Sequence, residues 1–393
     1  MARLSYNQIA SFLTAAYAQA TGGSSLSSLS FDTLQQVFTT DSVASEDNLY
    51  AYLDNVIGKT LFAVRPISEP MRSLEWEPSR YGDITRKLTP ITTEPVNNRE
   101  WDIGTELQQA TPDFACCSAP VLQDFLAVRI GGGNTYARKW TTYRDQMNAA
   151  FQSETQVVDF FSMLATERAN RMKLDRLSEK RALVNNAILG LYDYSGNAVF
   201  NALTEYNTET GSSYTTTTIM QPGVFREFMI WLASKIDYIR ELMQDNGKMF
   251  HQDVTGKEVD RHTPMSRQKL YLHSNFEKYF RANCSNLFNP AYLPEFAAVE
   301  SVPYWQDPQA PTSVQGTAQT IDSAGAIQTV ATALCENVIG ILFDDDFMGL
   351  SNINNWSAPE PYNARFGFQN TWYHQTYRSI TDFTENALLI RLA

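Results

Sequence analysis

The sequence predicts an α+β protein in which long helices and short strands occupy separate stretches of the chain. Between Gly133 and Gly190 there is no glycine or proline, which favours an uninterrupted helical region. From Leu61 to about Pro120, seven prolines divide the chain into short strand-like pieces. The length of 393 residues is sufficient for a large core or for two or three compact units.

The first 60 residues are predicted to form an arm without a core of its own. Residues 1–20 fit an amphipathic helix, and Asn7 and Ser11 interrupt the apolar run that a secretion signal would need. The segment 21–30, TGGSSLSSLS, has the composition of a flexible connector. The residues after it are typical of short helical pieces.

Within the proline-rich segment, the stretch YGDITRKLTPI predicts a strand without an apolar face. Ile84, Arg86 and Leu88 fall on one side of this strand. Thr85, Lys87 and Thr89 fall on the other. This pattern favours a two-stranded excursion that projects into solvent or onto a neighbouring molecule.

Two helices are predicted from their periodicity and their ends. The first, from Thr155 to Leu189, carries two apolar stripes with a charged middle and would span about 50 Å. The second runs from Pro222 to Asp245, opened by proline and closed by Gly247. Its core positions at helical spacing are Phe225, Phe228, Met229, Leu232, Ile236, Ile239 and Leu242.

The last third of the chain is predicted to mix strands with one helix. Residues 265–274 form a strand, 306–325 form a polar loop, and the following AIQTVATALCENV forms a helix. A long strand comes later, with Phe366, Phe368, Trp372 and His374 on one face. The chain ends in another strand.

Composition excludes some functions. The net charge of −12, from 43 acidic and 31 basic residues, argues against a protein that coats nucleic acid, because phosphate binding needs a basic face. The four cysteines form no disulfide framework or metal knuckle, which favours a reducing compartment. No stretch approaches the length of a membrane span.

The usual catalytic and cofactor motifs are incomplete. The GKT at Gly58 to Thr60 lacks the earlier glycine of a phosphate-binding loop, since Leu53 occupies that position. The four histidines make no close pair for zinc. GGGN, from Gly131 to Asn134, fits a hinge better than a dinucleotide site. We therefore predict no catalytic residue, cofactor or bound metal.

The strongest chemical candidate is the run Asp344, Asp345 and Asp346 in GILFDDDFMGL. Carboxylates at the end of a buried strand can hold Mg²⁺, so a Mg²⁺-dependent phosphotransferase or hydrolase is one alternative. However, successive strand side chains point to opposite faces, so three in a row cannot reach one ion without a turn. The favoured interpretation is a solvated acidic turn after an apolar segment.

Several stretches together resemble the major capsid proteins of tailed bacteriophages, which have the Hong Kong 97 type fold. The closing PYNARFGFQNTWYHQTYRSITDFTENALLIRLA is similar to the family's C-terminal segment, with its N-A-R turn, aromatic strand and D-F-T-E-N. ILFDDDFMGL is similar to the family's apolar run and acidic turn. The order of arm, Pro-rich hairpin, very long helix, mixed domain and final strand is also the family's order.

The resemblance implies a domain for each segment. Residues 1–60 would be the N-terminal arm and 61–120 the E-loop with its flanking strands, which lies over a neighbouring subunit. Residues 121–199 would be the peripheral domain, with the spine helix at 155–190, and 200–345 the axial domain. Residues 346–393 would be a C-terminal strand that returns to the peripheral domain.

The resemblance also implies partners. The chain would be a major capsid protein that self-assembles into hexamers and pentamers of an icosahedral phage head, in the cytoplasm of a bacterial host. It would enclose double-stranded DNA without sequence-specific binding and would work with a separate scaffolding protein, a portal and decoration proteins, but no membrane. Another virion protein, from the tail or decoration, is the remaining alternative. Candidate inter-subunit contacts are Arg80, Arg86, Lys87, Glu94 and Arg99.

Overall fold

The computed structural model describes residues 70–76, 84–90, 125–131, 134–143, 154–194, 196–245, 247, 249–253, 259–284, 299–322, 324 and 326–393. These residues belong to two compact units. The described part of unit 1 comprises 70–76, 134–143, 154–183 and 349–379. The other described residues form unit 2. The predicted arm, 1–60, lies outside the described residues, as does most of 61–120.

The predicted long helix is confirmed as α5, which runs from Glu154 to Tyr194. Its 41 residues correspond to a length of about 60 Å. The helix passes through Gly190, where a Cβ atom would lie 2.3 Å from the Phe383 ring. Glycine at this position therefore permits a close approach of Phe383 and does not end the helix.

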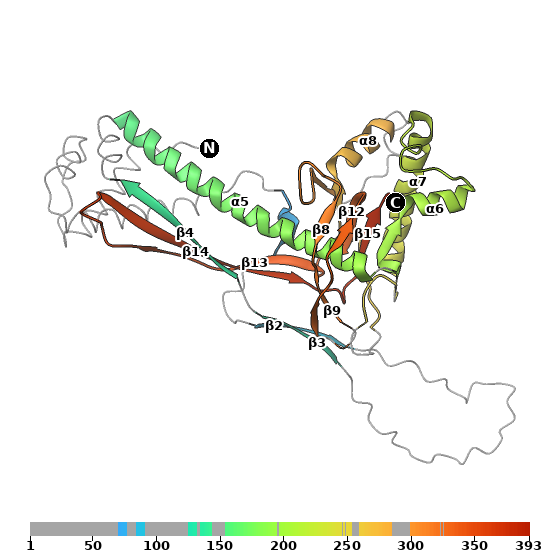
Figure 1. Cartoon of the computed structure of the whole chain (residues 1–393). Helices are drawn as coiled ribbons and strands as arrows, with labels where there is room; N and C mark the ends of the chain where they lie inside the picture. The colour runs from blue at the N-terminus through green and yellow to red at the C-terminus, as the bar shows by residue number, and fades with distance from the viewer. Residues whose placement is uncertain are drawn as a thin grey trace, which may run out of the picture. The chain divides into compact units, whose positions relative to one another are not determined.

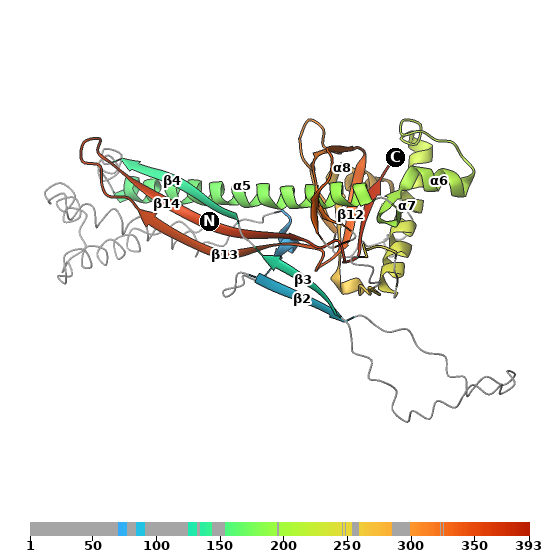
Figure 2. The ribbon, with the colours of Figure 1, turned by 60° about the horizontal axis from the view of Figure 1, so that its bottom comes forward.

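Unit 1 is built on a four-stranded sheet with the order β1-β13-β14-β4. The strands are β1 (Glu75–Trp76), β4 (Asn134–Tyr143), β13 (Met348–Pro359) and β14 (Phe368–Thr381). Ten consecutive residue pairs join β14 to β4 in antiparallel register. Figures 1 and 2 both show α5 running alongside β4 and β14. The predicted aromatic strand is confirmed as β14, but Phe366 lies in the turn before it.

Unit 2 contains a five-stranded sheet with the order β5-β15-β12-β6-β7. These strands are β5 (Val199–Asn201), β6 (Gln268–His273), β7 (Val299–Val302), β12 (Val338–Asp344) and β15 (Ala387–Arg391). The central strand β12 pairs antiparallel with both β15 and β6, and all seven of its residues are buried. The apolar run of its first six residues, 338–343, matches this central position.

Helix α7 (Pro222–Gln244) supplies much of the core of unit 2, as predicted. Six of the seven predicted positions are buried, and Leu242 packs against the core while remaining partly exposed. Among the described residues of this unit, the other α-helices besides the end of α5 are α6 (Ala202–Thr210) and α8 (Ser274–Cys284). Both α6 and α7 lie close to the sheet in Figure 1. No helix in the described part of the chain is long and apolar enough to cross a bilayer.

The prediction of a helix through AIQTVATALCENV is wrong, because this segment forms strands β10 (Ile327–Thr329) and β11 (Ala333–Cys335). The preceding segment, predicted as a loop, contains β8 (Val314–Gly316) and β9 (Gln319–Ile321). β10 pairs with β9, and β11 pairs with β8. The β-branched residues of the segment fit strands, and tertiary pairing decides between two weak local preferences.

The remaining strands form a separate ribbon in unit 2. The predicted strand in YGDITRKLTPI is confirmed as β2 (Ile84–Pro90), and it pairs antiparallel with β3 (Phe125–Gly131). Residues 346–393 contain β13, which was not predicted, together with β14 and the predicted terminal strand, β15. Short 3₁₀ turns lie at Arg72–Leu74, Gly196–Ala198 and Met265–Arg267.

Candidate functional site: the acidic turn and the root of the β2–β3 ribbon

The three aspartates form a charged turn at the end of β12. Asp344 is buried, and its Oδ1 accepts hydrogen bonds from the Asp346 backbone N–H at 2.9 Å and from Arg267 Nη2 at 3.4 Å. Arg267 also pairs with Asp346 at 2.5 Å. Asp345 pairs with Lys269. The turn therefore binds two cationic side chains from the start of β6 and the residue before it.

This geometry separates the carboxylates that the magnesium hypothesis needs together. Asp344 and Asp346 meet at Arg267, whereas Asp345 points to Lys269. Burial lowers the pKa of Arg267, but the three aspartates outweigh it and raise that pKa above its usual value. Among the described residues, no group of three histidine, cysteine, aspartate or glutamate side chains is arranged to hold a metal ion.

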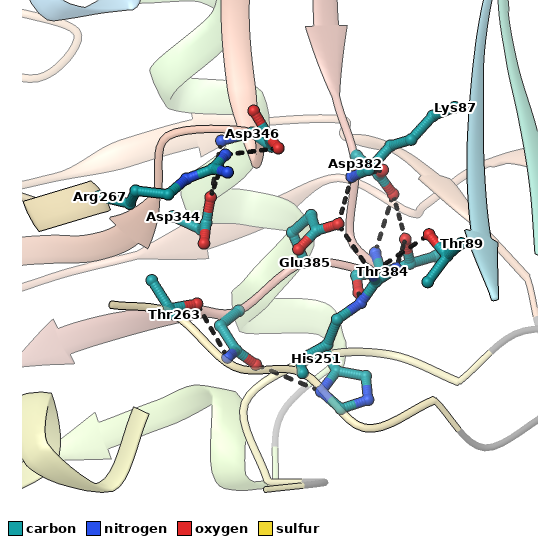
Figure 3. A network of polar contacts seen from close by, with 12 residues as sticks. Lys87, Thr89, His251, Thr263, Arg267, Asp344, Asp346, Asp382, Thr384 and Glu385 are labelled. Carbon is teal, nitrogen blue, oxygen red and sulfur yellow. Dashed lines mark hydrogen bonds and ion pairs between the residues drawn. The ribbon is translucent and has the colours of Figure 1, made fainter. Parts of the chain in front are cut away.

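A second polar cluster lies at the loop before β15, residues 382–386 (Figure 3). Asp382 Oδ1 accepts hydrogen bonds from the Thr384 backbone N–H at 3.0 Å and from the Thr384 hydroxyl at 2.6 Å. This pattern is an aspartate (Asx) turn, in which the side-chain oxygen accepts a hydrogen bond from the backbone N–H two residues later. The other carboxylate oxygen, Oδ2, accepts a hydrogen bond from Lys87 Nζ at 2.8 Å.

Two cations neutralise the two acids of this loop. Lys87, on β2, pairs with both Asp382 and Glu385. Arg261 pairs with Glu385 at 3.1 Å and donates through Nε to the Thr384 carbonyl oxygen at 2.7 Å. Arg261 Nη1 also donates to the Thr89 hydroxyl at 3.3 Å. Burial raises the pKa of Glu385 even though Lys87 and Arg261 oppose the shift.

Two of the three histidines of unit 2 are packing residues, and the third, His262, is exposed at the surface. His251 and His273 are buried, and burial lowers the pKa of both. His251 Nδ1 lies 3.3 Å from Asn386 Oδ1, and the amide of Asn386 donates to the Thr263 hydroxyl at 3.1 Å (Figure 3). These bonds extend the polar cluster along the same loop.

Unit 1 also buries charge, at positions where the sequence shows only a charged helix. Arg168 of α5 lies with its guanidinium carbon 5.4 Å from the Trp140 ring centre and 5.7 Å from that of Tyr373. Lys180, also on α5, pairs with Glu75 at 2.8 Å. The helix thus contacts its sheet partly through cations against aromatic rings and a carboxylate.

Of the five predicted inter-subunit contact residues, the structure describes the side chain of Lys87 alone. Lys87 lies in the polar cluster described above. Arg86 lies on β2, and its side chain is outside the described residues, as are Arg80, Glu94 and Arg99. All five remain predictions as contacts between subunits.

Sequence reasoning missed Arg261, Asp382 and Glu385 as a charged cluster. The signal was present in the D-F-T-E-N stretch, since an aspartate two residues before a threonine is typical of a side-chain-capped turn. The contribution of Arg261 could not be read, because it comes from a loop 123 residues away.

Two solved structures resemble this chain over most of their length. The capsid structure of Staphylococcus phage Andhra matches with a TM-score of 0.53 and 12% identity, over 84% of this chain and 86% of that chain. The structure of the head fiber and inner core protein gp22 of native bacteriophage P68 contains a chain that matches with a TM-score of 0.55 and 12% identity, again over 84% and 86%. The fold is that of tailed-phage capsids of the Hong Kong 97 type.

The family follows from the sequence itself. The family model described as Phi29-like phage major capsid protein matches residues 9–391, and the chain therefore belongs to this family. No curated protein sequence matches the chain. The protein is a structural subunit of the virion and not an enzyme, and proteins of this kind form shells from many copies. The predicted resemblance is confirmed, and nothing supports the Mg²⁺-dependent alternative.

Proposed function

We propose that this subunit assembles into hexamers and pentamers, and that these capsomers close into an icosahedral head around double-stranded DNA in the cytoplasm of a bacterial host. The family match over residues 9–391 carries the proposal, because a major capsid protein must build most of a closed container. A closed shell requires interfaces that repeat by symmetry, so many modest contacts together give it strength.

The domain roles are part of this proposal. Residues 1–60 would be the arm, 61–120 the E-loop, 121–199 the peripheral domain, 200–345 the axial domain and 346–393 the C-terminal segment. Arg80, Arg86, Lys87, Glu94 and Arg99 would contact neighbouring subunits. The two compact units support a division into separately packed parts.

Further partners follow from the needs of a head. A separate scaffolding protein would set the curvature of the shell, a portal would occupy one vertex, and decoration proteins would bind outside. The net charge of −12 favours packaged DNA that does not adhere to the shell, since like charges repel across the inner surface.

Co-expression with a candidate scaffolding protein tests the proposal. Sedimentation and negative-stain microscopy should show capsomers when the chain is expressed without the scaffold, and closed shells when the scaffold is present. A matched culture with the scaffold gene frameshifted is the control. If the chain stays in small soluble species in both cultures, with neither capsomers nor shells, the proposal is contradicted.

A further inference from the structure

The ribbon of β2 and β3 raises the question of what holds it in place. Its seven residue pairs are regular, but neither strand pairs with any other strand in the described part of the chain. A two-stranded ribbon is at best marginally stable alone in water. Contacts made by its side chains must therefore fix its position.

The contacts that the ribbon makes with the loop before β15 are polar. Lys87 and Thr89 lie two residues apart and so on the same face of β2, and both reach the cluster of Arg261, Asp382 and Glu385 (Figure 3). Leu88 lies on the opposite face of this strand and is 63% exposed. Apolar packing by this stretch of β2 therefore contributes little to the joint, and the apolar contribution of the ribbon comes from Leu126 of β3, which is buried opposite Thr89.

The loop holds its carboxylates in place independently of the ribbon. The Asp382 backbone N–H donates to the Phe347 carbonyl at 2.7 Å, and the Gln252 N–H donates to the Phe383 carbonyl at 2.8 Å. The Ala387 N–H donates to the Phe250 carbonyl at 2.9 Å. Because these backbone bonds hold the loop, it presents both carboxylates to Lys87 in a fixed geometry. This fixes the direction from which the ribbon contacts the loop.

We propose that Lys87, Arg261, Asp382 and Glu385 form a charge-balanced latch that fixes the root of the β2–β3 ribbon on the loop before β15. Two cations face two carboxylates, and the side chains of Asp382 and Glu385 are only 2% and 9% exposed. A buried ionic cluster specifies one arrangement, but the loss of one partner leaves a buried charge uncompensated. The latch therefore depends most on each buried carboxylate keeping a cation, because Lys87 is itself 23% exposed and water can solvate its charge.

The pH dependence follows from Glu385. Burial raises its pKa in the latch, so a proton binds more readily there than in an open state where water surrounds the carboxyl. As the pH falls through the pKa that Glu385 has in the latch, protonation therefore stabilises the latched state relative to the open state. The charged groups facing Glu385 are Lys87 on β2, Arg261 on the 259–264 segment and Asp382 on its own loop. His251 faces the adjacent Asn386.

Amide hydrogen exchange of the full chain, read in peptides covering β2 and β3, tests the latch. Lys87→Met leaves two carboxylates against one cation, and it should speed exchange in both strands at least tenfold at pH 7.5. The double variant Lys87→Met/Glu385→Gln restores the balance and should recover most of the protection. At pH 5, after correction for intrinsic rates, the loss in Lys87→Met should be smaller.

Lys278→Met, at an exposed lysine of α8 in the same unit, is the matched control and should exchange like the unaltered chain. The latch is refuted if Lys87→Met keeps full protection, or if the double variant is no better protected than Lys87→Met. If Lys87→Met does not fold, recovery of folding by the double variant supports the latch, and failure of both contradicts it. The latch lies within one chain, so this result does not depend on shell assembly.

Discussion

At the scale of single residues, this chain uses buried charge to fix geometry. Asp344, Asp382 and Glu385 are each held by a cation from a distant segment, and Arg168 lies against two aromatic rings. Such groups add little net stability compared with apolar residues, but their partial removal is costly. Substitutions that leave one of these buried charges without its partner should therefore lower the stability of the fold by more than is typical of an exposed ion pair.

The acidic turn makes this distinction testable. Asp344→Asn should lower the free energy of unfolding by about 1–3 kcal/mol, because its buried carboxylate accepts bonds from Arg267 and from the Asp346 backbone. Asp345→Asn and Asp346→Asn, at half-buried positions, should each change it by less than about 1 kcal/mol. Thermal unfolding measures all three.

The same variants test the magnesium hypothesis. Mg²⁺ should leave the midpoint of thermal unfolding of the unaltered chain unchanged, since a ligand stabilises only a state that binds it. A rise in the midpoint that disappears when all three aspartates become asparagine would overturn our interpretation of the turn.

Gly340 provides a prediction about packing. A Cβ atom there would lie 2.5 Å from the Tyr271 carbonyl oxygen, and strand backbone cannot move aside as a side chain can. Gly340→Ala should therefore destabilise unit 2 by about 2–3 kcal/mol. Gly223→Ala, in the first turn of α7 with no atom within 4 Å of the new Cβ, is the control and should be neutral or stabilising. Equal unfolding midpoints for the two variants would contradict the packing argument.

At the scale of elements, the joint between α5 and its sheet in unit 1 depends on Arg168. The guanidinium contacts Trp140 and Tyr373 and donates to the Tyr373 hydroxyl at 3.1 Å, which an ammonium cannot reproduce in the same geometry. Arg168→Lys should cost about 1–3 kcal/mol and speed exchange in β4 and β14. Arg171→Lys, at an exposed position of the same helix, should do neither. Unchanged exchange in Arg168→Lys would count against the joint.

Elements with strong periodicity could be predicted, and those that depend on distant partners could not. α7 could be predicted because its apolar residues repeat at helical spacing and a proline marks its start. β10 and β11 were not, because each strand has only three residues and depends on pairing with β9 or β8. For the polar cluster, the aspartate turn could be read from D-F-T-E-N, but Lys87 and Arg261 come from other segments.

At the scale of the whole molecule, the central claim is that this chain is a shell subunit. Its family and its Hong Kong 97 type fold define that role, and the order of segments along the sequence predicts it as well. A shell subunit is expected to have low affinity at each contact and high stability in the closed particle, because every copy is held by several neighbours.

The most direct test is an icosahedral reconstruction of particles formed by the full chain with its scaffolding partner. The density should contain the chain as the repeating subunit of a closed shell, around both fivefold and sixfold positions, with the long α5 helix visible in every copy. A chain that persists as a 44.4 kDa monomer under all assembly conditions, or that occupies only a tail or a surface spike, would contradict the claim.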